Sequence, residues 1–401
     1  MSFGYRVLGF GQSEISLFPQ ENFSLSAETL IDGDNNLDVF GFDLDRHNRG
    51  KGAICWRDGG NIRIKAFTSS TGNAITLGST QTIALGANFR NDADNLAFIG
   101  SDKFVIGYIK NGDSQNNSTN PCVRICTVSG TTVSVGSETV VRGSYSNGMI
   151  TCGDEEVDDR LCVMFTTYHN SAYRVMVQAA TVSGTTPSFG GMTELTSDNG
   201  NACSQSYRNG RLMIAYKDHY GANFGTVVRA CSVSGNSITL GSQVTYDSAQ
   251  HAKNGYVRVN PNNTNEAIVA NQNKSNNKPQ LKIATLSSNS VSFGSFITVD
   301  DKNVELHKVR WNKLFEDKIV SIYTDEDATA SDPGRAKFKV GTIDGSSINY
   351  GDEISLLGSN AGAQLFEFDA HADGADKFFY IYKTDSDNYS AIRIGQIGGR
   401  S

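Results

Sequence analysis

Apolar and polar residues alternate along most of this chain, in short runs separated by Gly, Asn, Asp and Ser. A period of two places successive side chains on opposite faces of a strand, so each run predicts a half-buried β-strand. Two such runs are Ile62–Lys65 (Ile-Arg-Ile-Lys) and Val123–Cys126 (Val-Arg-Ile-Cys). No long window shows the 3.6-residue period of an amphipathic helix. The pattern therefore predicts an all-β protein.

One phrase recurs along the chain: a β-branched strand, a Ser-Gly or Ser-Asn turn, and a second alternating strand that ends in Gly. The terminal glycines are spaced 51 to 58 residues apart, as the differences of their positions show. Self-similarity at a fixed period is the signature of a repeat architecture. The six copies are Thr68–Gly78, Thr127–Gly136, Thr181–Gly190, Ser232–Gly241, Thr285–Gly294 and Thr342–Gly351.

Each period contains four alternating runs, which predicts a four-stranded antiparallel blade. In the second period these runs are Asn95–Ile99, Lys103–Lys110, Cys122–Thr127 and Thr132–Val141. Blades of about 54 residues account for nearly all of the chain if there are seven of them. We therefore predict a single seven-bladed β-propeller over residues 1–401.

The two ends of the sequence predict how the ring closes. Ile392–Ser401 aligns with Phe338–Ser347, which are the third strand and the turn of the preceding repeat. The last repeat therefore lacks its own fourth strand. The segments Leu8–Gly11 and Glu14–Leu17 resemble Ile348–Leu356. We therefore expect an N-terminal strand at about 6–18 to complete the C-terminal blade, which removes an open sheet edge. The predicted blades are 37–86, 93–142, 147–197, 201–247, 254–300, 303–357, and 362–401 together with 6–18.

Charge and hydropathy narrow the classes of partner. The formal net charge is −7 and the sequence pI is about 5.4. No cluster of Lys and Arg is present, so a groove that follows nucleic-acid phosphates is not expected. The N-terminus has no long apolar run and no stretch reaches the ~18 apolar residues of a membrane span. We expect no signal peptide, no membrane insertion and synthesis in a bacterial cytoplasm.

The seven cysteines are expected to be buried, structural thiols. Their number is odd, and most of them lie in apolar runs such as Ile54–Trp56. Only Cys122 and Cys126 lie close together in sequence, without a second pair of ligands that would complete a zinc site. Free thiols agree with synthesis in a reducing compartment.

One acidic loop is a candidate calcium site. Asp32, Asp34, Asn36 and Asp38 place oxygen atoms at alternate positions, which suits a hard cation. The loop resembles the calcium loop of FG-GAP propellers, although Leu37 replaces the central glycine of that motif and the loop occurs once. A solvated loop that leads into the first blade is the alternative. We expect no other cofactor.

Catalytic motifs are not found in the sequence. Two carboxylates across a glycosidic bond are the requirement for glycoside hydrolysis. Asp43, Asp45, Glu367 and Asp369 lie on predicted first strands, where acidic residues also commonly line a wet central channel. WD40 dipeptides, kelch glycine pairs and sialidase Asp boxes are absent as well. We therefore expect a protein that is not an enzyme.

The repeat, which is rich in Asn, Ser and Gly, resembles β-propeller modules of bacteriophage virion proteins, in particular tail-associated and adhesin modules. The resemblance covers the whole chain and implies a structural or attachment protein of the virion. Its implied partners are other virion proteins, a host cell-surface glycan, or a host cell-surface protein. The resemblance assigns no functional residue.

The candidates for binding come from the loops between second and third strands, which vary most among the repeats. A rigid scaffold that presents variable polar loops is suited to recognition. Packing at the rim of the ring is the alternative role for the aromatic residues. A lectin-like carbohydrate-binding propeller is the second hypothesis, and a polysaccharide-degrading enzyme is the third. The candidate binding residues are Tyr168, His169, His219, Tyr220, Asp325, Asp327 and Tyr389.

Overall fold

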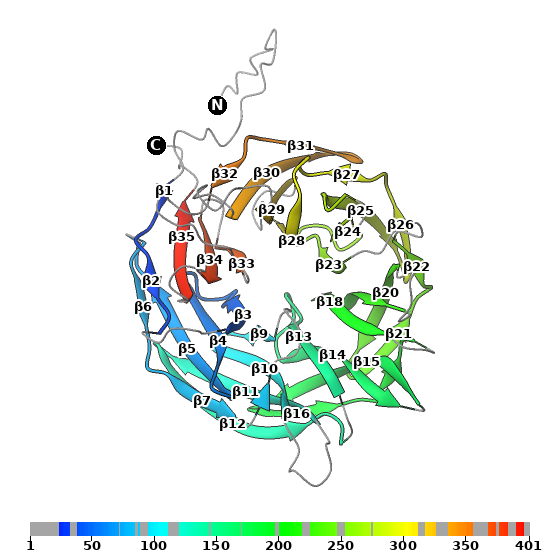
Figure 1. The fold of residues 1–401 in the computed structure, drawn as a ribbon. Coiled ribbons are helices and arrows are strands. Elements are labelled where there is room, and N and C mark those ends of the chain that lie inside the picture. The colour runs from blue at the N-terminus through cyan, green and yellow to red at the C-terminus, as the bar shows by residue number, and fades with distance from the viewer. Residues whose placement is uncertain are drawn as a thin grey trace, which may run out of the picture.

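The computed structural model describes most of the chain and contains β-strands and turns. The described residues are 24–32, 38–71, 73–84, 87–88, 95–110, 120–143, 146–169, 171–196, 200–218, 225–246, 253–273, 276–311, 317–325, 336–355, 368–373, 377–383 and 390–396. Within them the strands form seven antiparallel sheets arranged as blades around a central axis (Figure 1). The predicted seven-bladed propeller is confirmed. Across these same residues no helix is long and apolar enough to cross a membrane.

The blades follow one another in chain order around the ring. Blade 1 contains β3 (Asp38–Leu44), β4 (Lys51–Asp58), β5 (Asn61–Ser69), β6 (Ile75–Leu77) and β7 (Gln81–Ala84). Blade 2 contains β8 (Ala87–Asn88), β9 (Leu96–Gly100), β10 (Lys103–Lys110), β11 (Asn120–Ser129) and β12 (Thr132–Val140). Blade 3 contains β13 (Ser146–Gly153), β14 (Arg160–His169), β15 (Ala172–Ser183), β16 (Thr186–Phe189) and β17 (Thr193–Glu194). Blade 4 contains β18 (Asn201–Arg208), β19 (Arg211–Lys217), β20 (Thr226–Ser234), β21 (Ser237–Leu240) and β22 (Val244–Thr245).

The remaining three blades have the same plan. Blade 5 contains β23 (Lys253–Val259), β24 (Glu266–Gln272), β25 (Pro279–Ser287), β26 (Ser290–Phe293) and β27 (Ile297–Thr298). Blade 6 contains β28 (Val304–Trp311), β29 (Lys318–Asp325), β30 (Ala336–Asp344), β31 (Ser347–Tyr350) and β32 (Ile354–Ser355). Blade 7 contains β33 (Phe368–Asp373), β34 (Lys377–Lys383), β35 (Ser390–Gln396), β1 (Ser24–Leu25) and β2 (Thr29–Leu30). Each blade has four strand positions, and one of them is divided into two pieces.

The glycine that ends each repeat has a steric reason. The third and fourth strands of most blades are joined by a two-residue turn in the left-handed region, for example at Gly130 (φ 59°) and Gly235 (φ 57°). The turn of one blade lies against the terminal glycine of the blade before it. A Cβ at Gly190 would overlap the carbonyl oxygen of Asn236, and one at Gly241 would overlap that of Asn289. The glycine recurs in the sequence because each of these positions contacts the turn of the neighbouring blade.

The hydrophobic core consists of layers between neighbouring blades. Ala53 and Cys55 of blade 1 form one cluster with Phe104 and Tyr108 of blade 2. Further clusters of buried residues join blades 2 and 3, 3 and 4, 4 and 5, and 5 and 6. Another joins blade 1 to blade 7, where the rings of Phe67 and Phe379 are 5.5 Å apart. Blades 1 to 5 therefore have both faces covered by their neighbours.

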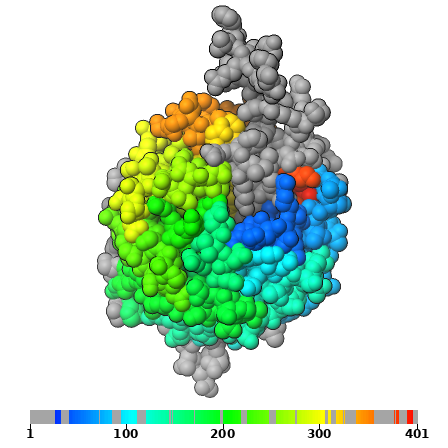
Figure 2. Space-filling view, turned by 180° about the vertical axis from the view of Figure 1, so that it is seen from behind, coloured from blue at the N-terminus to red at the C-terminus, as the bar shows by residue number. Residues whose placement is uncertain are grey.

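The ring is closed by the N-terminal segment, as predicted, but by residues later than predicted. β1 and β2 pair antiparallel with β35, with Ser24 opposite Gln396 and Thr29 opposite Ile392. The amide of Ser26 donates to the carbonyl of Ile394, and the amide of Ile394 donates to Ser26 Oγ. Figure 2 shows the two ends of the described chain side by side on the ring.

The predicted closing strand at 6–18 lies outside the described residues, and the edge of β35 over 391–396 is occupied by 24–30. The segment Ser24-Leu25-Ser26 has the same position in blade 7 that Asn349-Tyr350-Gly351 has in blade 6. Ser26 replaces the glycine of the repeat, so a search for that glycine selects the earlier Leu8–Gly11.

Buried aspartates join neighbouring blades at the turns between first and second strands. Asp154 is fully buried and accepts hydrogen bonds from the amides of Glu156 and Val157 in its own turn. It also accepts from the amides of Asn209 (2.7 Å) and Gly210 (3.1 Å) in blade 4. Charge-assisted bonds of this kind are about twice as strong as neutral ones. Asp154 therefore fixes two turns and the contact between their blades.

The glycine contact between blades predicts a difference between two Gly→Ala variants. Gly241→Ala should lower the free energy of unfolding by about 1–3 kcal/mol, because the new methyl group meets the backbone oxygen of Asn289. Gly351→Ala should change it by less than about 0.5 kcal/mol or stabilise slightly, since its nearest neighbour is 3.7 Å away. Guanidinium unfolding followed by the fluorescence of Trp56 and Trp311 measures both. Equal effects would contradict this account.

The aspartate contact predicts a second difference. Asp154→Asn should destabilise the protein by about 2–3 kcal/mol, because a buried, charge-assisted acceptor of four amides is replaced by a neutral group with one oxygen. Asp301→Asn is the matched control. Asp301 is 90% exposed and pairs with Lys278, so its loss should cost less than about 0.5 kcal/mol. Thermal and chemical unfolding of both variants test the difference.

Candidate functional site

The two faces of the ring differ in how uniform their loops are. The turns between third and fourth strands have two residues in blades 2 to 6, at 130–131, 184–185, 235–236, 288–289 and 345–346, and five residues in blade 1, at 70–74. They share one face with the turns between first and second strands. The loops between second and third strands lie on the other face and range from two residues at 170–171 to ten at 326–335. We call this second face the variable-loop face.

Two of the predicted binding residues lie together on the variable-loop face. Tyr168 is 49% exposed, and its ring stands edge-on to that of Tyr173 with centroids 5.3 Å apart. His169 Nδ1 lies 3.0 Å from a guanidinium nitrogen of Arg142, and another nitrogen of Arg142 lies 3.6 Å from the sulfur of Met192. Met192 is 43% exposed. We call these five residues the rim patch.

The other predicted binding residues are placed differently or not described. Asp325 is buried at the end of β29, and its carboxylate is 2.8 Å from Lys302 Nζ. The carboxylate of Asp325 is therefore not accessible to a ligand from solvent. The remaining candidates, His219, Tyr220, Asp327 and Tyr389, lie outside the described residues.

A network of ion pairs surrounds Asp325 in blade 6. Lys302 Nζ also pairs with Glu353 (3.0 Å), and Tyr323 donates to both Asp300 (2.7 Å) and Glu353 (2.8 Å). Burial alone would raise the pKa of Glu353, but the hydrogen bonds from Lys302 and Tyr323 hold it below its usual value. Burial and the two carboxylates raise the pKa of Tyr323. These carboxylates are ionised and paired, which is typical of a structural network.

The calcium candidate is only partly described. Asp34 and Asn36 lie outside the described residues, and only the backbone of Asp38 is described, at the start of β3. Asp32 Oδ1 is 4.0 Å from Lys65 Nζ, which donates to the carbonyl of Ile31. No group of three or more His, Cys, Asp and Glu side chains within the described ranges could hold a metal ion. The calcium site stays a prediction.

Asp43 in β3 and Asp45, which directly follows that strand, have structural partners. Asp43 accepts hydrogen bonds from the amides of Leu44 (2.9 Å) and of Phe98 in blade 2 (2.7 Å). Asp45 is buried and accepts from the amides of His47 and, in blade 2, Asp102. Both carboxylates therefore join blade 1 to blade 2. Of the other two acids on first strands, Glu367 lies outside the described residues and Asp369 is described by its backbone in β33.

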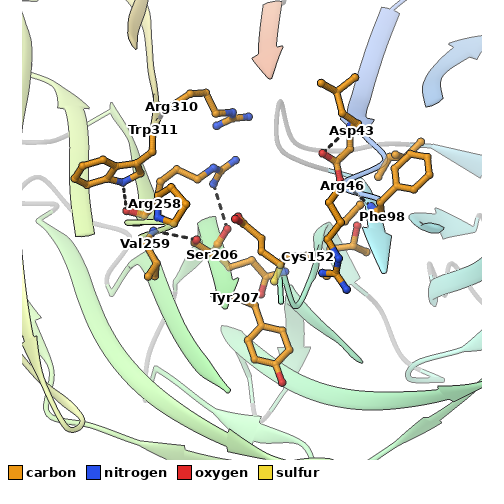
Figure 3. Close-up of a pocket in the computed structure, with 18 of the residues that line it drawn as sticks. Asp43, Arg46, Phe98, Cys152, Ser206, Tyr207, Arg258, Val259, Arg310 and Trp311 are labelled. Carbon is orange, nitrogen blue, oxygen red and sulfur yellow. Dashed lines mark hydrogen bonds between the residues drawn. The ribbon is translucent and has the colours of Figure 1, made fainter. Parts of the chain in front are cut away.

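A hollow opens at the centre of the ring, among the first strands of blades 1 to 6 and near their turns into the second strands (Figure 3). Its volume is about 900 Å³, including the part open to solvent. Figure 3 shows Arg258 and Arg310 extending from one side and Asp43 and Arg46 standing on the other. We call this hollow the channel pocket.

The strand register explains which side chains meet in the channel pocket. In each blade, one first-strand residue lies opposite the third residue of the second strand, as Arg258 lies opposite Ile268. This position repeats around the ring and defines a single layer of the channel. Its members in blades 1 to 7 are Asp43, Ala97, Cys152, Ser206, Arg258, Arg310 and His371. The first six line the pocket, and His371 is placed by its backbone alone.

The two arginines of this layer are held by aromatic and backbone contacts. The guanidinium carbons of Arg258 and Arg310 lie 4.0 Å and 4.8 Å from the ring centroid of Tyr256. Arg258 donates to the carbonyls of Val257 (2.8 Å) and Gln205 (3.2 Å), while Trp311 Nε1 donates to the carbonyl of Arg258. These arginines were not singled out from the sequence. The signal was present, because both occupy the same place in Tyr-Val-Arg258 and Lys-Val-Arg310.

Cysteine chemistry is suppressed by burial. All seven cysteines are free thiols, and five of them are fully buried. Burial raises the pKa of Cys126 to about 12 and that of Cys231 to about 11. Burial also raises the pKa of Cys162, with a further contribution from the nearby Cys152. The thiolate is the reactive form, so these residues are poor nucleophiles at neutral pH.

Comparison with known proteins supports the fold. No family model matches the sequence, and no curated protein matches it. The structure is similar to the β-propeller domain of the Trilobed protease from Pyrococcus furiosus, with 7% sequence identity, a TM-score of 0.50, and coverage of 91% of this chain and 97% of that one. It is also similar to a protein of unknown function from Dyadobacter fermentans, with 9% identity, a TM-score of 0.52, and coverage of 94% and 99%. At these identities the likeness shows the propeller fold alone.

The thiol environment predicts slow labelling in the folded state. With a pKa of about 12, roughly one Cys126 in 10⁴ is a thiolate at pH 8, so its reaction with Ellman's reagent should be at least about 1,000-fold slower than that of a free cysteine. Unfolding in guanidinium should release all seven thiols at the ordinary rate. Rapid native labelling of Cys126, located by peptide mass spectrometry, would contradict the buried placement.

Proposed function

We propose that this chain is a non-enzymatic recognition module that binds a partner through its variable-loop face. The observation that carries the proposal is the contrast between the two faces. The turns between third and fourth strands have two residues in blades 2 to 6 and five in blade 1, whereas the loops between second and third strands range from two residues to ten. Loops that differ on a uniform scaffold give one ring many different contacts, as recognition requires.

The rim patch supplies a preformed anchor on this face. Tyr168 is held edge-on by Tyr173, so little side-chain entropy is lost when a partner covers it. Met192 adds a flexible apolar group, and Arg142 adds a guanidinium between Met192 and His169. Tyrosine and arginine are enriched among the residues that dominate binding energy. The rim patch therefore presents a half-exposed aromatic ring on the blade 4 face of β14 and the group of Arg142, His169 and Met192 on its blade 2 face, and a protein surface that covers this end of blade 3 contacts both.

The carboxylates of the channel support a role without catalysis. Asp43 in β3 and Asp45 directly after it accept hydrogen bonds from backbone amides of two blades. A glycosidase instead needs one acid free to protonate the leaving group and a second that faces the sugar. Carboxylates whose oxygens already accept hydrogen bonds from backbone amides favour a structural role.

The setting that we propose is the virion of a bacteriophage, at the tail or particle surface. The support is the resemblance of the Asn-, Ser- and Gly-rich repeat to propeller modules of virion proteins. The partners would be other virion proteins, a host cell-surface glycan or a host cell-surface protein. A lectin-like propeller is the second candidate, because the half-exposed ring of Tyr168 also suits the apolar face of a sugar.

The virion proposal predicts a fixed copy number. Quantitative mass spectrometry of purified phage particles should find this chain at a constant ratio to the major capsid protein across preparations. Its presence in free lysate alone would contradict a virion role and would leave the lectin-like reading, which glycan arrays then test.

The rim patch predicts a specific loss of binding. The double variant Tyr168→Ala/Met192→Ala should lower the affinity for the particle or cell surface by at least about tenfold, because the aromatic anchor is removed. Phe296→Ala is the matched control, since Phe296 is 42% exposed and occupies in blade 5 the place that Met192 has in blade 3. Pull-down with labelled wild type and both variants compares them. Equal losses would show that the patch has no special role.

A further inference from the structure

We infer that Cys152 and Cys162 form a redox modification site, in which a small hydroperoxide that enters the channel pocket converts the two thiols into a disulfide. Cys152 lines the channel pocket, and Figure 3 shows it among the residues around the hollow. The rim patch contributes no residue to that lining. The inference therefore does not depend on the proposed function.

The first argument is the strand register of blade 3. β13 and β14 pair antiparallel with Cys152 directly opposite Cys162, and the register is unbroken from Met149 to Gly153. Residues directly opposite each other in an antiparallel pair extend to the same face of the sheet. Both cysteines accordingly pack in the apolar cluster between blades 3 and 4.

The spacing of the two strands suits a disulfide. Two positions further on, the amide of Asp154 donates to the carbonyl of Arg160, so Cys152 and Cys162 also form a hydrogen-bonded pair. The Cα atoms of such a pair are about 5.5 Å apart, within the range of about 4.4–6.8 Å that a disulfide spans. The Cβ atoms must approach from about 5 Å to about 4 Å. β13 ends the strand order of its described sheet on the channel side, so no further strand of that sheet opposes this movement.

The second argument is that the pair is distinctive within the ring. All seven cysteines lie in the described ranges, and the register places only Cys152 and Cys162 opposite each other. Blade 3 is therefore the one blade in which a residue of the channel layer faces a thiol. The residues opposite this layer in the other six blades are Ala53, Val105, Met213, Ile268, Val320 and Phe379.

The third argument is the difference in exposure between the two thiols. Cys152 is half-buried and lines the hollow, whereas Cys162 is fully buried on the next strand outward. Burial raises the pKa of Cys162, and its hydrogen bond with Cys152 raises it further. Cys162 therefore keeps its proton, and Cys152 is the thiol that an oxidant in the channel meets first.

The chemistry takes two steps and consumes one hydroperoxide. With hydrogen peroxide, the Cys152 thiolate attacks one oxygen, the O–O bond breaks, and Cys152 becomes a sulfenic acid while hydroxide leaves. The sulfur of Cys162 then attacks the sulfur of Cys152, the S–O bond breaks, and the Cys162 proton leaves with the hydroxyl group as water. The hydroxide takes up the proton that Cys152 had released. The two thiols together lose two electrons, and the peroxide is reduced to two molecules of water.

The test is oxidation of the reduced full chain by hydrogen peroxide, followed by alkylation and tryptic digestion without reductant. Cys152 and Cys162 fall in separate tryptic peptides, 143–160 and 161–174, each with one cysteine. We expect these peptides to appear as one linked species, and the thiols counted after unfolding to be two fewer than the seven of the reduced protein. A reductant should restore both thiols. Absence of the linked species, or links between other cysteines in its place, would overturn the inference.

The variants are Cys162→Ser and, as a matched control, Cys203→Ser. Cys203 is also half-buried on a first strand, but the register is broken there and places no residue opposite it. Cys162→Ser should raise the labelling of Cys152 by dimedone, which traps sulfenic acids, at least about fivefold over the wild type, because no second thiol consumes the sulfenic acid. Cys203→Ser should leave the linked peptides and this labelling unchanged. Equal labelling of Cys152 in the wild type and Cys162→Ser would overturn the inference.

A measurement on the wild type keeps the test valid if Cys162→Ser does not fold. In guanidinium the same oxidation should link Cys122 to Cys126 as well as Cys152 to Cys162, because short loops close readily in an unfolded chain. The native protein should link Cys152 to Cys162 alone, since Cys122 and Cys126 lie four positions apart on one extended strand. The same mixture of links in both conditions would overturn the inference, because the fold would then not be what pairs the thiols.

Discussion

The contact between blades is the interaction on which the rest of this structure depends. Blades 1 to 5 are each covered on both faces by apolar layers shared with their neighbours, so these blades have no polar face that could be left in water. A ring satisfies this requirement only if the first and last blades also meet. The layer that contains Phe67 and Phe379, and the pairing of 24–30 with β35, complete it. Closure is therefore a condition for burial of blades 1 and 7.

The same contact explains why some positions carry the same residue type in every blade while others differ. Terminal glycines and left-handed turns recur because the turn of one blade touches the outer strand of the blade before it. Asp45 and Asp154 join blades through their turns in the same way. The channel layer lies beside the channel pocket and does not include the residues of these turns. Residues as different as Asp43, Ala97 and Arg310 therefore occupy equivalent positions there.

Much of the fold was predictable because turn chemistry repeats in the sequence. The alternating strands, the Ser-Gly turns and the spacing of the glycines predicted the seven blades. The closing strand was predicted at the wrong place because Ser26 stands where the other repeats have glycine. The hydroxyl of Ser26 accepts a hydrogen bond from the amide of Ile394, so this strand pairs without the glycine that marks the repeat. Arg258 and Arg310 were missed because they are recognised as equivalent positions only after each first strand has been paired with its second strand. The placement of Tyr168 and His169 at the end of a second strand was predictable from the alternating pattern, whereas their role in binding stays a prediction.

The closing pair also has a consequence for biosynthesis. The hydrogen-bonded residues Ser26 and Ile394 are separated by 368 positions in the chain. At roughly 5–20 residues per second, the N-terminal segment leaves the ribosome about 20–70 s before its partner strand is made. During that interval blade 1 has one face without a neighbour, and the segment at 24–30 has no edge to join. A translating cell must therefore keep this early segment away from other exposed strands until the last blade emerges.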